Sequence, residues 1–249
     1  MNVIGIIPAR YESSRFPGKP LALINGNSMI ERVYRQACKA LDNVLVATDD
    51  ERIHNHVLSF GGKSVMTSKN HRSGTDRCYE AFLRSGTDAN VVVNIQGDEP
   101  FVEPEQIRSL VSLFPTDIAT LVSPFAPDSK FSDLSDPNLV KVVIDKSSGR
   151  ALYFSRSVIP YMRGEEPDSW ASKHTYLRHI GMYAYRSDVL RHITALPHSS
   201  LESSEALEQL RWLEYGYEIR VAHSHIQTIG IDTPDDLKRA QQYAKEHGL

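Results

Sequence analysis

The sequence has little of what marks several classes of protein. Two cysteines occur among its 249 residues, Cys38 and Cys78, too few for a disulfide framework and without the spacing of metal ligands. No segment reaches the roughly 18 apolar residues of a membrane span, and no basic region precedes the first apolar segment, as it would in a signal peptide. We therefore expect a cytoplasmic protein whose cysteines are reduced and packed.

A surplus of charge of one sign is also missing. Lysine and arginine total 28 and the acidic residues 31, which gives a formal net charge of -3. A protein whose main partner is nucleic acid or an anionic membrane would carry an excess of basic residues. Neither partner is therefore expected. Positive charge is instead local, in the loop after the first apolar segment and around Arg72 to Arg77.

The common glycine-rich phosphate loops are missing as well. Gly18-Lys19 is followed by Pro20 where a P-loop requires Ser or Thr, and Ser13 stands where that motif begins with glycine. No G-x-G-x-x-G follows the first strand-like segment, which argues against a dinucleotide-dependent dehydrogenase. No Ser-His-Asp or Cys-His arrangement indicates a protein nucleophile.

What the sequence does contain is an abrupt change of character within its first twenty residues. The apolar segment 2–8 leads directly into Pro8-Ala9-Arg10, and Arg15 and Lys19 follow in the same loop. In an open α/β sheet, ligands bind beyond the carboxyl ends of the strands, and arginine, lysine and exposed backbone N–H groups bind phosphate oxygens. This loop is therefore the predicted site of a nucleoside triphosphate.

The rest of the chain alternates between strand-like and helix-like segments. Such alternation is typical of an α/β fold with a mostly parallel sheet covered by helices on both faces. The pattern breaks into Pro- and Ser-rich sequence after residue 124, so we expect one domain over 1–249 with an inserted β-rich subdomain at approximately 125–185. The expected segments are strands at 2–8, 43–47, 63–66, 91–95, 118–122, 139–145, 151–155, 178–185 and 218–222, and helices at 27–41, 50–60, 75–85, 104–113, 187–195 and 203–215, with a last helix after Asp232-Thr233-Pro234.

Two acidic residues stand where apolar segments end. Asp98 follows the segment 91–95, and Asp232 comes just before the last helix. Mg²⁺ takes one or two protein carboxylates and completes its shell with water and substrate phosphates, so Asp98 is a predicted ligand and Asp232 its candidate partner. Two alternatives stay open, because Gly97-Asp98-Glu99-Pro100 is also typical of a polar turn and Asp232-Thr233-Pro234 of a helix cap.

Nine short blocks occur in one order along nearly the whole chain. They are Ile7-Pro8-Ala9-Arg10-Tyr11, Ser14-Arg15-Phe16-Pro17-Gly18-Lys19-Pro20-Leu21, Ala47-Thr48-Asp49, Ser73-Gly74-Thr75-Asp76-Arg77, Gln96-Gly97-Asp98-Glu99-Pro100, Ala151-Leu152-Tyr153-Phe154-Ser155-Arg156, His179-Ile180-Gly181-Met182-Tyr183, Leu207-Glu208-Gln209-Leu210-Arg211 and Asp232-Thr233-Pro234. The ordered set resembles the 3-deoxy-manno-octulosonate cytidylyltransferase family, the CMP-Kdo synthetases. The match fades in 124–137 and 163–175.

This resemblance implies a fold, a reaction and a set of roles. The fold would be Rossmann-like, of the nucleotide-diphospho-sugar transferase type. The reaction would join CTP and the sugar acid Kdo into CMP-Kdo and pyrophosphate, with Mg²⁺ as cofactor. The residues implied are Arg10, Lys19, Asp98 and Asp232 for catalysis, the last two as metal ligands, and Pro8, Ala9, Arg10, Arg15, Lys19, Arg72, Ser73, Gly74 and Gln96 for CTP. Ser73 is also a candidate helix N-cap, and the two roles are compatible.

The sugar acid would bind residues in the second half of the chain. A carboxylate with many hydroxyls requires cationic and amide groups on rigid elements, and the resemblance implies Arg156, His179, Tyr183, Glu208 and Gln209 for this site. Glu208 and Gln209 adjoin an apolar leucine stripe and are expected at its boundary. For His179 the alternative is a hydrogen-bonded core histidine between apolar strands.

Other hypotheses remain beside the transfer of CMP to Kdo. The same chemistry could act on 8-amino-Kdo or another keto-sugar acid, or the chain could be a non-catalytic nucleotide- or sugar-binding regulator on the same fold. The resemblance also implies a homodimer, with the insertion around 139–185 as its expected interface, and a place in lipopolysaccharide assembly in a Gram-negative cytoplasm.

Overall fold

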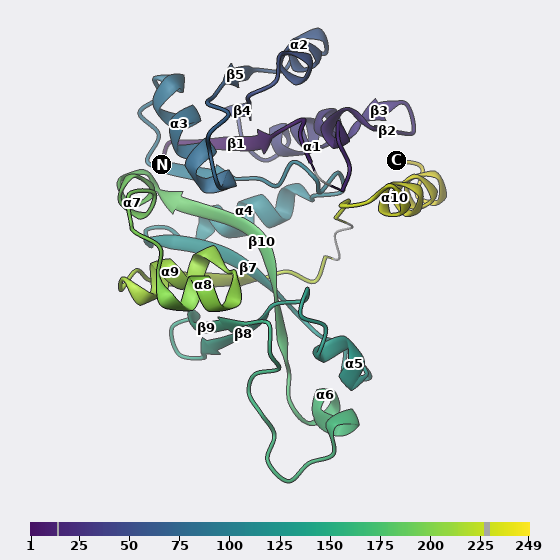
Figure 1. Ribbon diagram of the computed structural model, residues 1–249, viewed down its shortest axis with the longest axis vertical. Helices are drawn as coiled ribbons and strands as arrows, with labels where there is room; N and C mark the ends of the chain where they lie inside the picture. Colours follow the sequence, from purple (N-terminus) through teal and green to yellow (C-terminus); the bar gives the residue numbers. More distant parts are fainter. Residues whose placement is uncertain (14, 227–229) are drawn as a thin grey trace. The chain divides into compact units, whose positions relative to one another are not determined.

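A computed structural model describes residues 1–13, 15–226 and 230–249 (Figure 1). Ser14, which belongs to one of the sequence blocks named above, lies outside the described residues. The chain divides into two compact units: unit 1 is formed by Met1–Arg108 with Gln227–Leu249, and unit 2 by Ser109–Ile226. The insertion expected at 125–185 falls within unit 2. Helix α4 (Pro104–Ser112) contains the boundary where the chain leaves unit 1.

Unit 1 is built on four parallel strands in the order β5-β4-β1-β6. These strands are short and rich in valine and isoleucine, as expected for a sheet buried on both faces. All four residues of β6 and most of β1 are buried. Their bounds are β1 Val3–Ala9, β4 Val44–Thr48, β5 Ser64–Met66 and β6 Val91–Asn94. The parallel sheet predicted for this half of the chain is confirmed.

The order of the strands places a ligand-binding point between β1 and β6. The chain runs from β1 outward to β4 and β5, and then returns past β1 to β6. With right-handed crossovers, α1 (Met29–Cys38) and α2 (Glu51–Ser59) cover one face, and α3 (Gly74–Ser85) covers the other. Ligands of open α/β sheets bind where the strand order reverses, outside the carboxyl ends of the strands.

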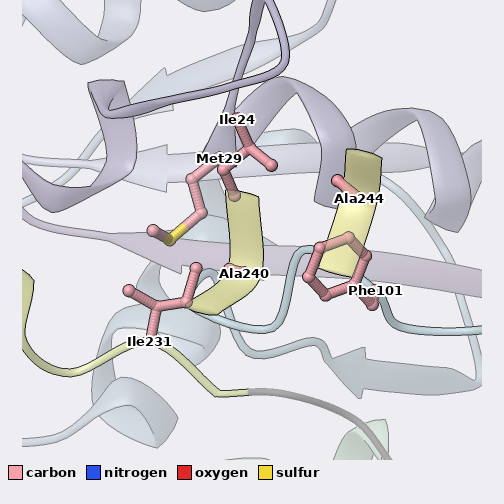
Figure 2. Close-up of a cluster of buried hydrophobic side chains, with 6 residues drawn as sticks. All are labelled: Ile24, Met29, Phe101, Ile231, Ala240 and Ala244. Atoms are coloured by element: carbon pink, nitrogen blue, oxygen red, sulfur yellow. The ribbon is translucent and has the colours of Figure 1, made fainter. Parts of the chain in front are cut away.

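The last helix, α10 (Pro234–Glu246), returns to unit 1 and packs on its N-terminal hairpin, formed by β2 (Leu23–Ile24) and β3 (Asn27–Ser28). Figure 1 shows α10 beside this hairpin, and the Gln241 side chain donates to the Leu23 carbonyl at 2.9 Å. Figure 2 shows the apolar cluster beneath, which consists of Ile24, Met29, Phe101, Ile231, Ala240 and Ala244. The C-terminal segment is therefore a structural part of unit 1.

Unit 2 contains five strands in the order β10-β7-β11-β9-β8, and β8 also pairs with β10. Only the pairing of β7 with β11 is parallel among the described pairings here, so the parallel prediction does not extend to this unit. The strands are β7 Ile118–Pro124, β8 Lys141–Asp145, β9 Arg150–Ser155, β10 Leu177–Arg186 and β11 Ile219–His223. The helices are α5 Phe131–Leu134, α6 Trp170–Lys173, α7 Ser187–Ile193, α8 Ser200–Glu205 and α9 Glu208–Glu214, and the 3-10 turns are η1 Lys19–Leu21 in unit 1 and η2 Pro167–Ser169.

Two predictions about local structure were wrong. The single helix expected at 203–215 is two helices, α8 and α9, because Ala206 adopts a left-handed conformation with φ of 49° and ends α8. Cys78 is buried as expected, but Cys38 is exposed, and both are free thiols. None of the described helices has the length and apolar character needed to cross a membrane.

Ile231 belongs to the apolar cluster of Figure 2 and directly precedes Asp232 in the chain. Its side chain is fully buried, so Ile231→Ala should leave a cavity and lower the free energy of unfolding by about 2–5 kcal/mol. Urea denaturation followed by circular dichroism measures the change. Leu58→Ala, at a side chain 50% exposed, is the control and should stay within about 0.5 kcal/mol of the wild type; equal effects of the two substitutions would contradict the prediction.

Candidate active site

A cavity of about 360 Å³ opens at the carboxyl ends of β1 and β6. Every residue predicted from the sequence for CTP, catalysis or metal lines it, and all of them belong to unit 1. Five more residues also line it: Ser13, Pro20, His71, Arg77 and Gly97. The lining carries five arginine or lysine side chains against two carboxylates, and this local cationic excess suits a polyanionic ligand in a protein of net charge -3.

Glycine allows the loops after β1 and β6 to meet at the base of this cavity. A Cβ on Gly97 would lie 2.8 Å from the backbone oxygen of Pro8, closer than a side chain tolerates. The contact continues the pairing of the two strands, in which the Ile95 amide donates to the Ile6 carbonyl at 2.9 Å. Gly97 therefore brings Gln96 and Asp98 beside Pro8 and Ala9.

The basic loop after β1 is folded on itself by Tyr11 and Gly18. The Gly18 amide donates to the Tyr11 carbonyl at 2.8 Å, and Gly18 has a φ of 73°, a conformation that glycine adopts without strain. The Arg52 guanidinium lies over the Tyr11 ring, 3.3 Å from its centre. Phe16 packs against the apolar cluster of Figure 2. These contacts hold Arg15 and Lys19 at the cavity.

Lys19 joins the two acidic residues that the sequence analysis paired. Its Nζ lies 2.8 Å from Asp98 Oδ2 and 3.2 Å from Asp232 Oδ1, and its side chain is 15% exposed. Asp232 also receives Arg15 Nη2 at 3.1 Å. The Ile231 amide donates to the Asp98 carbonyl at 3.0 Å, which ties the Asp232 segment to the loop after β6. The two carboxylates, distant in sequence, therefore face one point of the cavity.

The helix-cap alternative for Asp232 does not hold for its side chain. The cap of α10 is Thr233, whose hydroxyl accepts from the Asp236 amide at 3.2 Å, and the Asp236 carboxylate accepts from the Thr233 amide at 2.8 Å. This reciprocal capping box needs no contribution from the Asp232 carboxylate. That carboxylate, about half exposed, is instead available at the cavity.

The donor set at this point fits Mg²⁺. Asp98 Oδ2 and Asp232 Oδ1 both contact the ammonium nitrogen of Lys19. Two hard oxygen donors from distant parts of the sequence therefore converge on one point. Within residues 1–13, 15–226 and 230–249, no three His, Cys, Asp or Glu side chains gather as a ready-made metal site. A pair of carboxylates in an open, cationic cavity suits Mg²⁺, because this ion keeps waters and substrate phosphates in its shell.

The segment of Arg72, Ser73 and Gly74, which the resemblance implied for CTP, combines a structural role with access to the cavity. Ser73 caps α3, since its hydroxyl accepts from the Asp76 amide at 3.1 Å, and this part of the prediction is confirmed. A Cβ on Gly74 would meet Pro8 Cγ at 3.6 Å, an ordinary contact, so the protein alone does not require glycine there. Arg77, one turn later on α3, is 5% exposed and lines the cavity. Its position four residues after Ser73 was the signal that could have found it.

The residues predicted for the sugar acid all belong to unit 2, and the structure distributes them over two places. Arg156 lines a cavity of about 440 Å³, which the other four residues do not line. Its guanidinium is held by backbone oxygens: Nε donates to Glu205 at 2.6 Å and Nη1 to Pro137 at 2.7 Å. These bonds fix the guanidinium, so a structural role accompanies any role in binding.

His179 and Tyr183 lie together on β10, with ring centres 5.2 Å apart. His179 Nε2 lies 3.0 Å from Thr120 Oγ1, and Phe154 meets its ring edge-on. Burial lowers the pKa of His179 to about 3, so its ring is neutral at physiological pH. Burial also raises the pKa of Tyr183 well above 10. The hydrogen-bonded core histidine left open by the sequence matches this geometry.

Glu208 and Gln209 begin α9, next to this aromatic group. Trp212 of the same helix packs edge-on to Tyr183, with ring centres 5.1 Å apart. Glu208 accepts from Arg211 at 2.9 Å. Gln209 is 5% exposed, which contradicts the expected boundary position, and its Nε2 is buried with no hydrogen-bond partner among the described atoms. A buried unpaired amide is costly, so Gln209 offers a donor to a bound polar ligand.

Comparisons with known proteins agree over nearly the entire chain. The family model described as "Cytidylyltransferase" matches residues 4–220. A protein of Bacteroides thetaiotaomicron named 3-deoxy-manno-octulosonate cytidylyltransferase is 57% identical over 98% of this chain and 99% of its own length. A solved structure of CMP:2-keto-3-deoxy-manno-octonic acid synthetase complexed with CTP superposes with a TM-score of 0.90 at 40% identity, covering 99% of this chain and 100% of that one.

A more distant solved structure defines the fold class. A putative glucose-1-phosphate thymidylyltransferase from Bacillus anthracis gives a TM-score of 0.66 at 16% identity, with 98% of this chain and 96% of that chain covered. At this identity the likeness concerns the fold alone. The predicted nucleotide-diphospho-sugar transferase fold is confirmed.

The neutral state of His179, whose side chain is half-buried, predicts a dependence of stability on pH. Its pKa is about 3 in the folded chain against an ordinary 6.5, so between these values the unfolded chain binds a proton that the folded chain does not. Above pH 6.5 the free energy of unfolding is therefore not lowered by His179. From pH 6.5 toward pH 3 it falls by up to about 1.4 kcal/mol per pH unit because of this residue.

His179→Gln should therefore flatten the acid side of the stability profile, measured as the urea midpoint between pH 4 and 7. The matched control is His223→Gln, because His223 is an exposed histidine at the end of β11 and should keep the wild-type slope. A wild-type slope in the His179 variant would show that this residue takes up its proton in the folded chain.

Proposed function

This chain belongs to the 3-deoxy-manno-octulosonate cytidylyltransferase family, and we propose that it transfers CMP from CTP to the anomeric 2-hydroxyl of Kdo with release of pyrophosphate. The observation that carries the proposal is the convergence of Asp98, Asp232 and Lys19 on one point of a cationic cavity at the strand-order reversal. A binding regulator would need the cations alone. Two acidic residues beside a polyphosphate site indicate metal-assisted transfer, since they would otherwise repel the nucleotide.

The chemistry requires charge neutralisation more than covalent catalysis. The sugar hydroxyl oxygen forms a bond to the α-phosphorus, the bond from that phosphorus to the bridging oxygen of pyrophosphate breaks, and the hydroxyl proton is released. Negative charge develops on the leaving pyrophosphate and requires fixed cations. Arg10, Arg15 and Lys19 line the cavity in one loop and supply them. No protein nucleophile is needed, because the reaction is a direct displacement.

Mg²⁺ is the cofactor that we propose for this site, held by Asp98 and Asp232. Bound there, the metal would polarise a phosphoryl oxygen and lower the pKa of a coordinated hydroxyl. Lys19 contacts both carboxylates. When CTP and the metal are bound, its ammonium group would shift from the carboxylates to the phosphates. Pro8, Ala9, Arg72, Ser73 and Gly74 would surround the cytosine, with Gln96 nearby.

For the sugar acid we propose His179, Tyr183, Glu208, Gln209 and Arg156, all in unit 2. Support comes from the unpaired buried donor of Gln209, which a sugar hydroxyl or carboxylate would satisfy. The neutral ring of His179 would act as a hydrogen-bonding group and not as a cation, because burial keeps its pKa near 3. Kdo carries a hydroxyl at position 8 of the sugar and 8-amino-Kdo an amine. Of these two acids, we propose Kdo as the substrate.

The test measures pyrophosphate release with each of the four nucleoside triphosphates, against Kdo and 8-amino-Kdo, with Mg²⁺ present or chelated. We expect turnover with CTP, Kdo and Mg²⁺ together. Faster turnover with 8-amino-Kdo would move the assignment to that acid. No turnover with any acid, despite CTP binding, would favour the regulator.

Asp98→Ala should lower the rate by at least about 100-fold, because one of two carboxylate ligands is lost at a site where charge stabilisation dominates. Circular dichroism and the urea midpoint would show whether the fold is retained. Asp42→Ala, at an exposed aspartate before β4, should leave the rate unchanged. A normal rate in the Asp98 variant would refute its assignment as a metal ligand.

We propose further that the protein is a cytoplasmic homodimer serving lipopolysaccharide assembly. The homodimer is supported by the apolar lining of the 440 Å³ cavity in unit 2, which includes Phe131, Val158, Tyr161 and Trp170, with Tyr161 75% exposed. An apolar cavity with an exposed aromatic side chain at it is a feature common at protein interfaces.

Light scattering after gel filtration should give twice the chain mass for the wild type. Tyr161→Glu should shift the mass toward that of the monomer, because a charge would be buried unpaired at the interface. The control is Leu83→Glu, at an exposed leucine of unit 1, which should remain dimeric. A monomeric wild type at micromolar concentration would contradict the dimer.

A further inference from the structure

The loop of residues 67–72 connects β5 to α3 and brings His71 and Arg72 to the cavity. Three side chains of α3 follow one stripe of the helix below this loop: Ser73 at its N-cap, then Arg77 and Glu80, at spacings of four and three residues. Ser73 and Arg77 line the cavity. Glu80 does not line it, and the proposed reaction assigns it no role.

Arg77 holds the start of the loop. Its Nη1 donates to Thr67 Oγ1 at 2.6 Å and to the Ser68 carbonyl at 3.3 Å. Its Nη2 donates to Asp49 Oδ2 at 3.1 Å, where the loop after β4 begins. Because Thr67 also donates to the Thr48 carbonyl at 3.1 Å, the loop is linked to the end of β4 both directly and through Arg77.

Glu80 holds the same loop from the other side. Its Oε2 accepts from the Ser68 amide at 2.9 Å and forms an ion pair with His71 Nε2. Its Oε1 pairs with Arg84 at 2.6 Å, on the side away from the loop. Burial alone would raise the pKa of Glu80, but the Ser68 amide, His71 and Arg84 together hold that pKa below its usual value, so the carboxylate is charged.

Ser68 is therefore fixed at both of its backbone groups by side chains one turn apart on α3. Its amide donates to Glu80 and its carbonyl accepts from Arg77. Beyond this point Lys69, Asn70 and Arg72 are exposed, and a loop with exposed residues keeps its shape only where its backbone is anchored. His71 provides the second anchor, through its contact with Glu80.

We propose that Glu80 is a positioning residue for nucleobase binding, which acts through Ser68 and His71 and completes, with Arg77, a clamp on loop 67–72. The proposal rests on the proposed function, in which this loop borders the cytosine. Glu80 holds the loop in its binding conformation before the nucleotide arrives. CTP binding therefore does not have to supply the free energy of ordering the loop. Because Glu80 does not line the cavity, its loss affects binding and leaves the chemical step unchanged.

The variants are Glu80→Ala, Glu80→Gln and Arg84→Ala. Glu80→Ala removes both contacts to the loop. Glu80→Gln keeps an oxygen for the Ser68 amide but loses the charge opposite His71. Arg84→Ala is the matched control, because it removes a partner of the same carboxylate on the side away from the loop. The dissociation constant of CTP is measured by calorimetry without sugar acid, and KM and kcat by pyrophosphate release.

We expect CTP to bind about tenfold more weakly to Glu80→Ala and about threefold more weakly to Glu80→Gln, with Arg84→Ala within about twofold of the wild type. KM should rise in parallel while kcat stays within about twofold. Amide hydrogen exchange in 67–72 should accelerate in Glu80→Ala, with β1 and β6 unchanged. The ratio of the UTP dissociation constant to the CTP dissociation constant should fall most in Glu80→Ala, less in Glu80→Gln and least in Arg84→Ala.

Equal CTP affinity in all three variants would overturn the proposal, as would a fall in kcat with affinity unchanged. If Glu80→Ala does not fold, the comparison of Glu80→Gln with Arg84→Ala decides, since only the former is expected to weaken binding. Failure of the proposed function is recognised separately: the wild type would then release no pyrophosphate from CTP and Kdo, whatever the variants do.

Discussion

Lys19 occupies a position that the rest of the candidate active site depends on. Its ammonium bridges Asp98, 79 residues away in sequence, and Asp232, 213 residues away. Two carboxylates this close would repel each other if no cation lay between them. The lysine removes that repulsion, and the arginines of the same cavity leave it with a cationic excess. The site can thus offer oxygen ligands to a metal and still attract a polyphosphate.

The acidic pair is held by contacts that are themselves uncharged. The apolar cluster around Ile231 and Phe101 fixes α10 against the N-terminal hairpin, and the Ile231 amide bonds to the Asp98 carbonyl. Phe16 extends the same cluster beneath the basic loop. Burial of this kind is the main stabilising term in folding, so the position of the charges follows from hydrophobic packing a few residues away. The charged groups can then exchange partners without loss of the fold.

Much of unit 1 could be predicted from sequence, because the periodic pattern of hydrophobic residues in its strands and helices is visible within short stretches of the chain. Ser73 as an N-cap, the parallel strands and the placing of Arg10, Lys19 and Asp98 at strand ends follow from local patterns combined with the rule for strand ends. The pairing of Asp232 with Asp98 rested on the family resemblance, because its local pattern is equally typical of a helix cap. The role of these residues in binding remains a prediction.

The rest depended on contacts that no local pattern records. Alanine is the best helix former, so nothing at Ala206 indicates the left-handed conformation that separates α8 from α9. The burial of Gln209 follows from packing around Trp212 and not from its place on the leucine stripe. The contacts of Arg77 and Glu80 have no local signal either, because their partners in loop 67–72 become visible only once β5 and α3 are placed.

The return of the chain to unit 1 after residue 226 has a consequence for biosynthesis. Ribosomes deliver a protein from its N-terminus at roughly 5–20 residues per second, so the basic loop and the strand before Asp98 emerge well ahead of α10. Until Ile231 and Asp232 leave the exit tunnel, the nascent chain carries the cations of the cavity without its second carboxylate. The cavity is thus completed only after the whole of unit 2 has been synthesised.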